Sequence, residues 1–122
     1  MPLKVSTRTV DGVMVVDCSG RIVFGDEAIL LREQVKAALA KANAVVISLA
    51  GVSYIDSGGL GTLVGLYTSA RSAKAQLKLA AMNERVIDLL QITKLLTVFE
   101  VHKTVDQAVA SFAAAGKAAG AA

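Results

Sequence analysis

The chain has 122 residues, of which 54% are hydrophobic, and its formal net charge is +3, which predicts a packed domain and excludes a disordered chain. Its thirteen basic residues are interleaved with acids and aromatic residues are scarce, so we expect no direct DNA binding. No apolar run approaches the ~20 residues that cross a bilayer, and the first residues lack an apolar signal segment, so we expect no membrane insertion and a cytoplasmic location.

The N-terminal third predicts a hairpin followed by a helix. Asp11-Gly12 is a strong signal for a two-residue hairpin turn, and the second strand is expected to end near Ser19-Gly20. Cys18 in this strand is expected to be a core residue. Asp26 is the expected N-cap of the helix. The predicted elements are an edge strand over 4–9, a strand that begins at 13 and a helix over 27–41.

The middle of the chain joins a buried strand to a helix. An apolar, β-branched run predicts a strand over 45–49 that is covered on both faces. A period of 3.6 residues from Leu60 to Tyr67 predicts a helix over 58–70. Asp56-Ser57-Gly58-Gly59 lies between them. The residues alone leave two interpretations open: Ser57 is the N-cap of a glycine-rich turn, or it is an exposed site at a helix N-terminus that favours negative charge.

The C-terminal third continues the alternation of strands and helices. Asn83 is an expected helix cap, and Thr104 with Gln107 forms a capping box that opens the last helix. The predicted elements are a strand over 77–81, a helix over 84–93, a strand over 97–101 and a helix that ends near 112. The predicted fold class is α/β, a mixed and mainly parallel sheet with an N-terminal β-hairpin and about four packed helices. We expect a single domain over 1–112 and a frayed Ala/Gly-rich tail over 113–122.

Familiar catalytic, metal and nucleotide motifs are absent from the sequence. One His and one Cys are too few for a usual zinc site, so we expect no metal and no cofactor. Ile55 breaks the G-x-S-x-G pattern around Ser57, and the Gly58–Gly61 run fits neither a Walker A loop nor G-x-G-x-x-G. We therefore expect no catalytic residue and no enzyme activity. A hydrolase built from Ser57 and His102 remains a minor alternative, because distance along the sequence does not exclude it.

The run Val52–Gly61 resembles the signature of the bacterial anti-sigma factor antagonists, which are STAS domains, and the similarity extends over nearly the whole chain. The resemblance implies partner switching. The unmodified antagonist binds an anti-sigma factor that is also a serine kinase, and a sigma factor is freed. The kinase then phosphorylates the antagonist, binding is lost, and a PP2C-type phosphatase resets the switch.

The resemblance also assigns residues. Ser57 matches the phosphate acceptor and Asp56 matches the acid before it. The expected partner-binding residues surround this pair: Asp56, Ser57, Gly58, Gly59, Leu60, Thr62 and Leu63.

The chain departs from the family pattern at three positions. Gly58 replaces the usual second Ser or Thr, Val23 replaces an acid that many members carry near the acceptor, and Lys94 replaces a glycine after the third helix. An alternative keeps the fold without the switch. The chain is then a non-switching interaction subunit of a lipid-transport or signalling scaffold complex.

Overall fold

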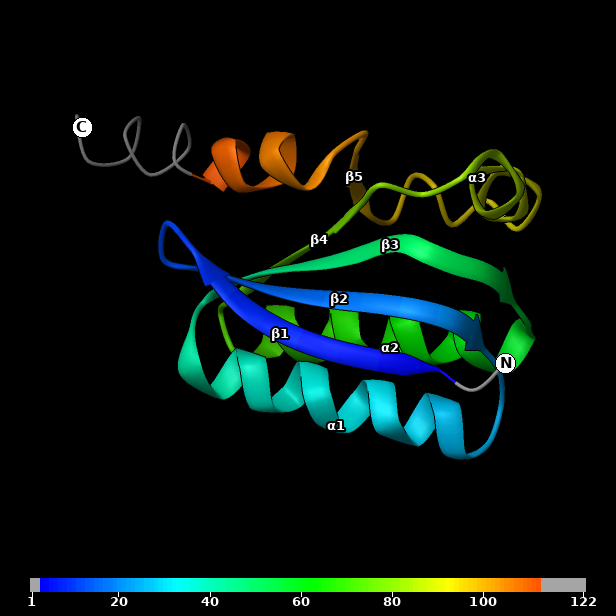
Figure 1. Ribbon diagram of the computed structural model, residues 1–122, viewed down its shortest axis with the longest axis horizontal. Coiled ribbons are helices and arrows are strands. Elements are labelled where there is room, and N and C mark those ends of the chain that lie inside the picture. Colours follow the sequence, from blue (N-terminus) through cyan, green and yellow to red (C-terminus); the bar gives the residue numbers. More distant parts are fainter. Residues whose placement is uncertain (1–2, 113–122) are drawn as a thin grey trace.

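The computed structural model describes residues 3–112, which form one five-stranded sheet with helices on both faces (Figure 1). β1 (Lys4–Val10) pairs antiparallel with β2 (Val13–Ile22). The order continues through three parallel neighbours, β3 (Ala44–Ile55), β4 (Gln76–Ala80) and β5 (Glu100–His102). The predicted α/β class, with a mainly parallel sheet and an N-terminal hairpin, is confirmed.

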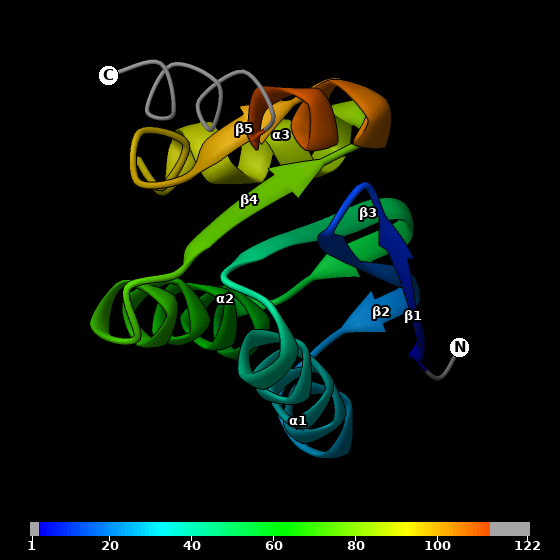
Figure 2. The same cartoon turned by 90° about the vertical axis from the view of Figure 1, so that its left-hand side faces the viewer.

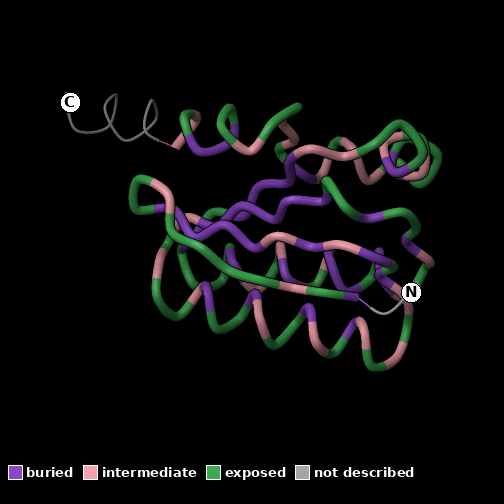
Figure 3. The backbone as a smooth tube through the Cα atoms, viewed as in Figure 1, coloured by how far each residue is buried: buried purple, intermediate pink, exposed green. Residues whose placement is uncertain are grey.

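Helices cover both faces of the sheet (Figure 2). α1 (Asp26–Lys41) and α2 (Ser57–Ser72) lie on one face, over the larger core cluster, which includes Leu31, Ile47 and Leu63. α3 (Glu84–Ile92) and a helical segment over 105–112 lie on the other face. A smaller cluster around Val15 and Val46 lies between the sheet and this last segment. The central strands are accordingly the most continuously buried part of the backbone (Figure 3).

The turn and cap signals of the sequence are largely confirmed. Asp11 and Gly12 have φ values of 51° and 81°, so both central residues of the hairpin turn are left-handed. The Asn83 carboxamide oxygen accepts the Val86 N–H at 2.9 Å and caps α3. The Thr104 hydroxyl accepts the Gln107 N–H at 3.1 Å at the start of the last helical segment.

Strand β3 is much longer than the predicted segment over 45–49, whereas β2 ends at Ile22, two residues beyond the predicted end near Ser19-Gly20. The register between them shifts at Asp17/Ser19 and at Gly20/Arg21, so the alternation of apolar residues is interrupted although pairing continues. In the sequence, Gly51 suggests the end of a strand, but it lies inside β3. A Cβ on Gly51 would lie 2.5 Å from the Ser19 Cβ, so the glycine permits the close approach of the two strands.

The predicted N-cap of α1 and the predicted limits of the last strand are wrong. Gly25, with φ of 109°, precedes α1 and no side chain caps the helix, so Asp26 is already helical and acts through the helix dipole. The last strand begins at Glu100 rather than at 97. The Val98 N–H donates to the Leu95 carbonyl oxygen at 3.0 Å, which holds the preceding residues in a turn.

Lys94 lies in the left-handed turn that ends α3. The Lys94 N–H donates to the Gln91 carbonyl oxygen at 3.0 Å and the Leu95 N–H to that of Leu90 at 2.9 Å, which is a Schellman motif. Lys94 has φ of 62°, a conformation that favours glycine, so its backbone is strained where many family members have glycine.

The predicted tail over 113–122 lies outside the described residues. Among residues 3–112, no helix combines the length and the apolarity that crossing a membrane requires.

Candidate functional site

The strand-to-helix junction lies at the carboxyl end of the parallel strands. β3 ends at Ile55, which pairs with Ile22 at the end of β2, and α2 begins at Ser57 (Figure 1). Asp56 has extended backbone angles, φ −93° and ψ −178°, and is the N-cap of α2. The interpretation of Ser57 as the N-cap is therefore wrong: Ser57 is the first residue of the helix, and it is exposed.

The Asp56 carboxylate connects three segments of the chain. Its Oδ1 accepts the Gly59 N–H at 2.8 Å, and both oxygens accept the Phe24 N–H, at 3.2 and 3.1 Å. The Asp56 N–H in turn donates to the Ile22 carbonyl oxygen at 3.2 Å. These hydrogen bonds, from Gly59 first and then from Phe24, lower the pKa of Asp56, and Arg21 adds a smaller effect. Asp56 is thus an ionised structural group at neutral pH.

Asp56→Ala is expected to lower the free energy of unfolding by about 1–2 kcal/mol, since it removes the cap and the hydrogen bond to Phe24.

Asp56→Asn keeps an N-cap but removes the charge. The pKa of Asp56 is lower in the folded state than in the unfolded state. The stabilisation of the fold by the ionised carboxylate is therefore complete above the unfolded pKa and is lost as the pH falls through the folded pKa. The stability difference between wild type and Asp56→Asn in urea should therefore shrink between pH 7 and pH 2. A constant difference would contradict this role.

Two glycines allow the junction to close against the end of β2. A Cβ on Gly59 would lie 2.2 Å from the Ile22 carbonyl oxygen, and one on Gly58 would lie 2.6 Å from the Phe24 Cβ. The position of Phe24 therefore leaves no room for the hydroxyl residue that the family usually has at 58. By contrast, a Cβ on Gly61 or on Gly65 would meet nothing within 4 Å.

Burial divides the expected partner-binding residues into two groups. Ser57 is exposed, and Asp56 and Gly58 are half-buried. The remaining four are buried and support the junction from inside: Gly59, Leu60, Thr62 and Leu63. The partner-binding role of all seven residues stays a prediction, and the exposed surface around Ser57 also includes residues outside this set.

The largest exposed apolar side chain beside the junction is Phe24, which is 82% exposed. Together with Ile29, which is 51% exposed, it borders a groove of about 360 Å³ between α1 and α2 whose floor includes Gly58 and Gly61. The sequence does not single out Phe24, because no local pattern indicates the exposure of this side chain.

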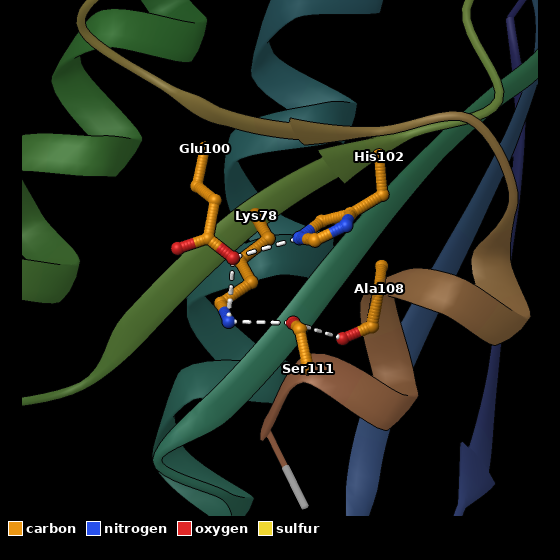
Figure 4. A network of polar contacts seen from close by, with 5 residues as sticks. All are labelled: Lys78, Glu100, His102, Ala108 and Ser111. Atoms are coloured by element: carbon orange, nitrogen blue, oxygen red, sulfur yellow. Dashed lines mark hydrogen bonds and ion pairs between the residues drawn. The ribbon is translucent and has the colours of Figure 1, made fainter. Parts of the chain in front are cut away.

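A second polar cluster lies on β4 and β5, away from the junction (Figure 4). The Lys78 side chain is 5% exposed, and its Nζ lies 2.7 Å from Glu100 Oε2 and donates to the Ser111 hydroxyl at 2.6 Å. The same Glu100 oxygen lies 2.7 Å from His102 Nε2. Hydrogen bonds from Lys78 and then from His102 lower the pKa of Glu100. This cluster fastens the segment over 105–112 to the sheet.

The structure does not bring His102 to Ser57. His102 aligns with Ala80, and Ala80 aligns with Ser48, which is seven residues before Ile55 on β3. At about 3.3 Å per strand residue, the two side chains are separated by roughly 20 Å along the sheet. The pair on which a hydrolase would depend is therefore not assembled.

Other reactive groups are also remote from the junction. Cys18 is 4% exposed, and burial raises the pKa of its thiol to about 12, so it is a protonated core residue, as predicted. Among residues 3–112, His, Cys, Asp and Glu side chains do not gather in groups of three that could hold a metal ion.

Comparison with known proteins gives consistent results. The family model described as "STAS domain" matches residues 4–108. The chain is 31% identical over 102 residues to the anti-sigma-B factor antagonist of Bacillus subtilis, covering 83% of this chain and 92% of the relative. It is 40% identical over 55 residues to the anti-sigma-B factor antagonist of Listeria monocytogenes. This match covers 45% of this chain and 48% of that relative, so it spans about half of each. A crystal structure of an anti-sigma factor antagonist from Mycobacterium paratuberculosis superposes with a TM-score of 0.78 at 26% identity, covering 89% of this chain and 92% of the other.

Proposed function

Because the chain belongs to the STAS domain family, among the anti-sigma factor antagonists, we propose that it regulates transcription by partner switching, with Ser57 as the switch. The unmodified chain binds an anti-sigma factor serine kinase and thereby releases a sigma factor. The kinase then transfers the γ-phosphoryl group of ATP to the Ser57 oxygen, the hydroxyl proton passes to a base of the kinase, and ADP leaves. Phosphorylated chain dissociates, and a PP2C-type phosphatase restores it.

The observation that carries this proposal is the contrast between Ser57 and its neighbour. Ser57 is exposed at the first position of α2, whereas the Asp56 carboxylate accepts two backbone N–H groups and has a lowered pKa. A carboxylate held in this way is a poor base, so Asp56 is not suited to activate the Ser57 hydroxyl. Ser57 is thus suited to be a substrate rather than a nucleophilic catalyst.

The junction can also accept the product. A phosphate adds a charge of about −1.5 to −2 at pH 7, and the N-terminus of a helix favours negative charge. Phosphorylation of Ser57 therefore leaves the fold intact while it changes the charge of the contact surface.

The groove between α1 and α2 supplies the first contact surface for the kinase. Phe24 and Ile29 present apolar side chains beside Ser57, and an exposed aromatic residue is a frequent anchor in interfaces. Gly61 and Gly65 lower helix stability by about 1 kcal/mol each relative to Ala, although no packing contact among residues 3–112 requires them. Their absent side chains let a partner backbone approach α2 closely. The proposed location is the cytoplasm, where sigma factors act.

The test is release of a sigma factor. Each anti-sigma factor serine kinase encoded in the source genome is purified in complex with its sigma factor, and the unmodified chain is added. For one of them, free sigma factor and a complex of kinase with this chain should appear by size-exclusion chromatography. The absence of both products with every kinase would contradict the proposal and would favour a non-switching interaction subunit. The kinase that gives the products is called the partner kinase below.

A further inference from the structure

The exposed large apolar side chains of the described residues gather at one end of the molecule. They are Phe24, Ile29, Tyr54 and Ile92, with exposed fractions of 82%, 51%, 43% and 78%. Phe24 and Ile29 lie on the side of α1 and α2, as described above. Tyr54 and Ile92 lie on the other face of the sheet, where α3 covers the end at which β3 turns into α2 (Figure 1). Ser57 is therefore flanked by apolar surface on both sides.

Tyr54 and Ile92 border a groove between the end of β3 and α3, which we call the α3 groove. It has a volume of about 440 Å³, and apolar atoms dominate its lining. Besides these two residues, its lining includes Ile55, Val86 and Leu89.

The α3 groove is held open by contacts that do not involve Ile92. The Asn83 carboxamide nitrogen donates to the Val52 carbonyl oxygen at 2.9 Å, and Val86 is 1% exposed in the core. These contacts fix the start of α3 against β3, so a ligand of the groove meets a preformed surface. Ile92, by contrast, extends into solvent at the end of the helix.

The charged residues in the groove lining are mainly acidic. Its three charged lining residues are Glu84, Arg85 and Asp88, so two of the three are acidic, whereas the chain carries a net charge of +3. Glu84 and Asp88 are one helical turn apart and therefore lie on the same side of α3. A basic side chain is the complementary neighbour for this pair.

The groove is continuous with the switch site. Tyr54 and Ile55 directly precede Asp56, and the Arg21 guanidinium carbon lies 5.5 Å from the centre of the Tyr54 ring. A stable interface buries about 800 Å² on each partner, so a partner that covers Ser57 is expected to contact the neighbouring surface as well.

We propose that the α3 groove is a second docking site for the partner kinase and receives an apolar side chain of the kinase flanked by a lysine or arginine. The proposal rests on the proposed function, because the occupant is the kinase that phosphorylates Ser57. It adds a contact surface outside the residues at 56–63, on the opposite face of the sheet from α2. The groove positions the kinase, and the phosphoryl transfer takes place at Ser57.

Ile92→Ser tests the docking role with little expected effect on the fold, since the side chain is 78% exposed. Steady-state phosphorylation of Ser57 by the partner kinase should show a KM about tenfold above that of wild type with kcat within twofold, because a remote docking contact acts on binding. Calorimetry without ATP should show a similar loss in affinity. Asp88→Lys should also weaken binding, and its effect should decrease at high salt.

Ala40→Ser is the matched control, because Ala40 is also exposed on a helix but lies near the far end of α1. It should leave KM, kcat and affinity unchanged, and all variants should melt close to wild type. Unchanged KM and affinity for Ile92→Ser, with wild type phosphorylated normally, would overturn the docking site and leave the proposed function standing. A homodimer of the wild-type chain that Ile92→Ser dissociates in sedimentation would also overturn it, since the occupant would be a second copy. Failure of wild type itself to react would instead reject the proposed function.

Discussion

Ser57→Asp is expected to weaken binding to the partner kinase by at least ~30-fold, because it places a fixed negative charge in the contact surface, and uncompensated charge in an interface costs several kcal/mol. Ser57→Ala removes only a hydroxyl and should bind like wild type. The fold should tolerate both changes, since Ser57 is exposed. An acid in the first turn of α2 should even stabilise the helix by about 0.3–1 kcal/mol.

The control adds the same charge elsewhere on the same helix. Ser72 is exposed at the opposite end of α2, 15 residues from Ser57, which is about 22 Å at 1.5 Å per residue. Ser72→Asp should therefore retain wild-type affinity. Calorimetry with the partner kinase measures all three variants. Equal affinities for Ser57→Asp and Ser57→Ala would show that charge at this position does not control binding.

Gly59→Ala is expected to cause the largest loss of stability, about 3 kcal/mol or more, and to reduce the folded population at 37 °C. The added Cβ would lie 2.2 Å from the Ile22 carbonyl oxygen and 2.9 Å from the Cγ2 atoms of Ile22 and Ile55. Backbone cannot yield as a flexible side chain can, so the start of α2 must move away from β2. That movement also breaks the hydrogen bond between the Gly59 N–H and Asp56.

Gly61→Ala is the matched control two residues along the same helix, where a Cβ meets nothing within 4 Å. It should raise the free energy of unfolding by about 1 kcal/mol, because alanine is the better helix former. Denaturation in urea measures both effects. A Gly59→Ala variant as stable as wild type would mean that α2 does not approach β2 as closely as described.

Much of the fold follows from local patterns. The hairpin was predictable because Asp11-Gly12 can adopt the two left-handed conformations that the turn needs. Asn83 and Thr104 were predictable as caps because their side chains bond within their own helix turn. The length of β3 was not predictable, because Gly51 is explained only by the approach of Ser19, a contact across 32 positions of the chain.

Part of the candidate site was also predictable from local patterns. The sequence located the junction and the exposed Ser57, but Asp56 rather than Ser57 caps α2, and its carboxylate is also shared with Phe24. Leu63 belongs to the apolar face that the helical period predicts, but the sequence does not show whether that face packs in the core or contacts a partner. The structure buries Leu63 completely. Exposure of Phe24 and Ile92 depends on where strands and helices end in space, so no local pattern indicates it.

The most direct test of the central claim is the position of the phosphate. The purified chain is incubated with ATP and, in turn, each anti-sigma factor serine kinase of the source organism, and phosphorylated residues are mapped by mass spectrometry. We expect a single phosphate on Ser57, which disappears in Ser57→Ala and is removed by a PP2C-type phosphatase. No phosphate on Ser57 with any of these kinases, or phosphate that persists in Ser57→Ala, would contradict the account.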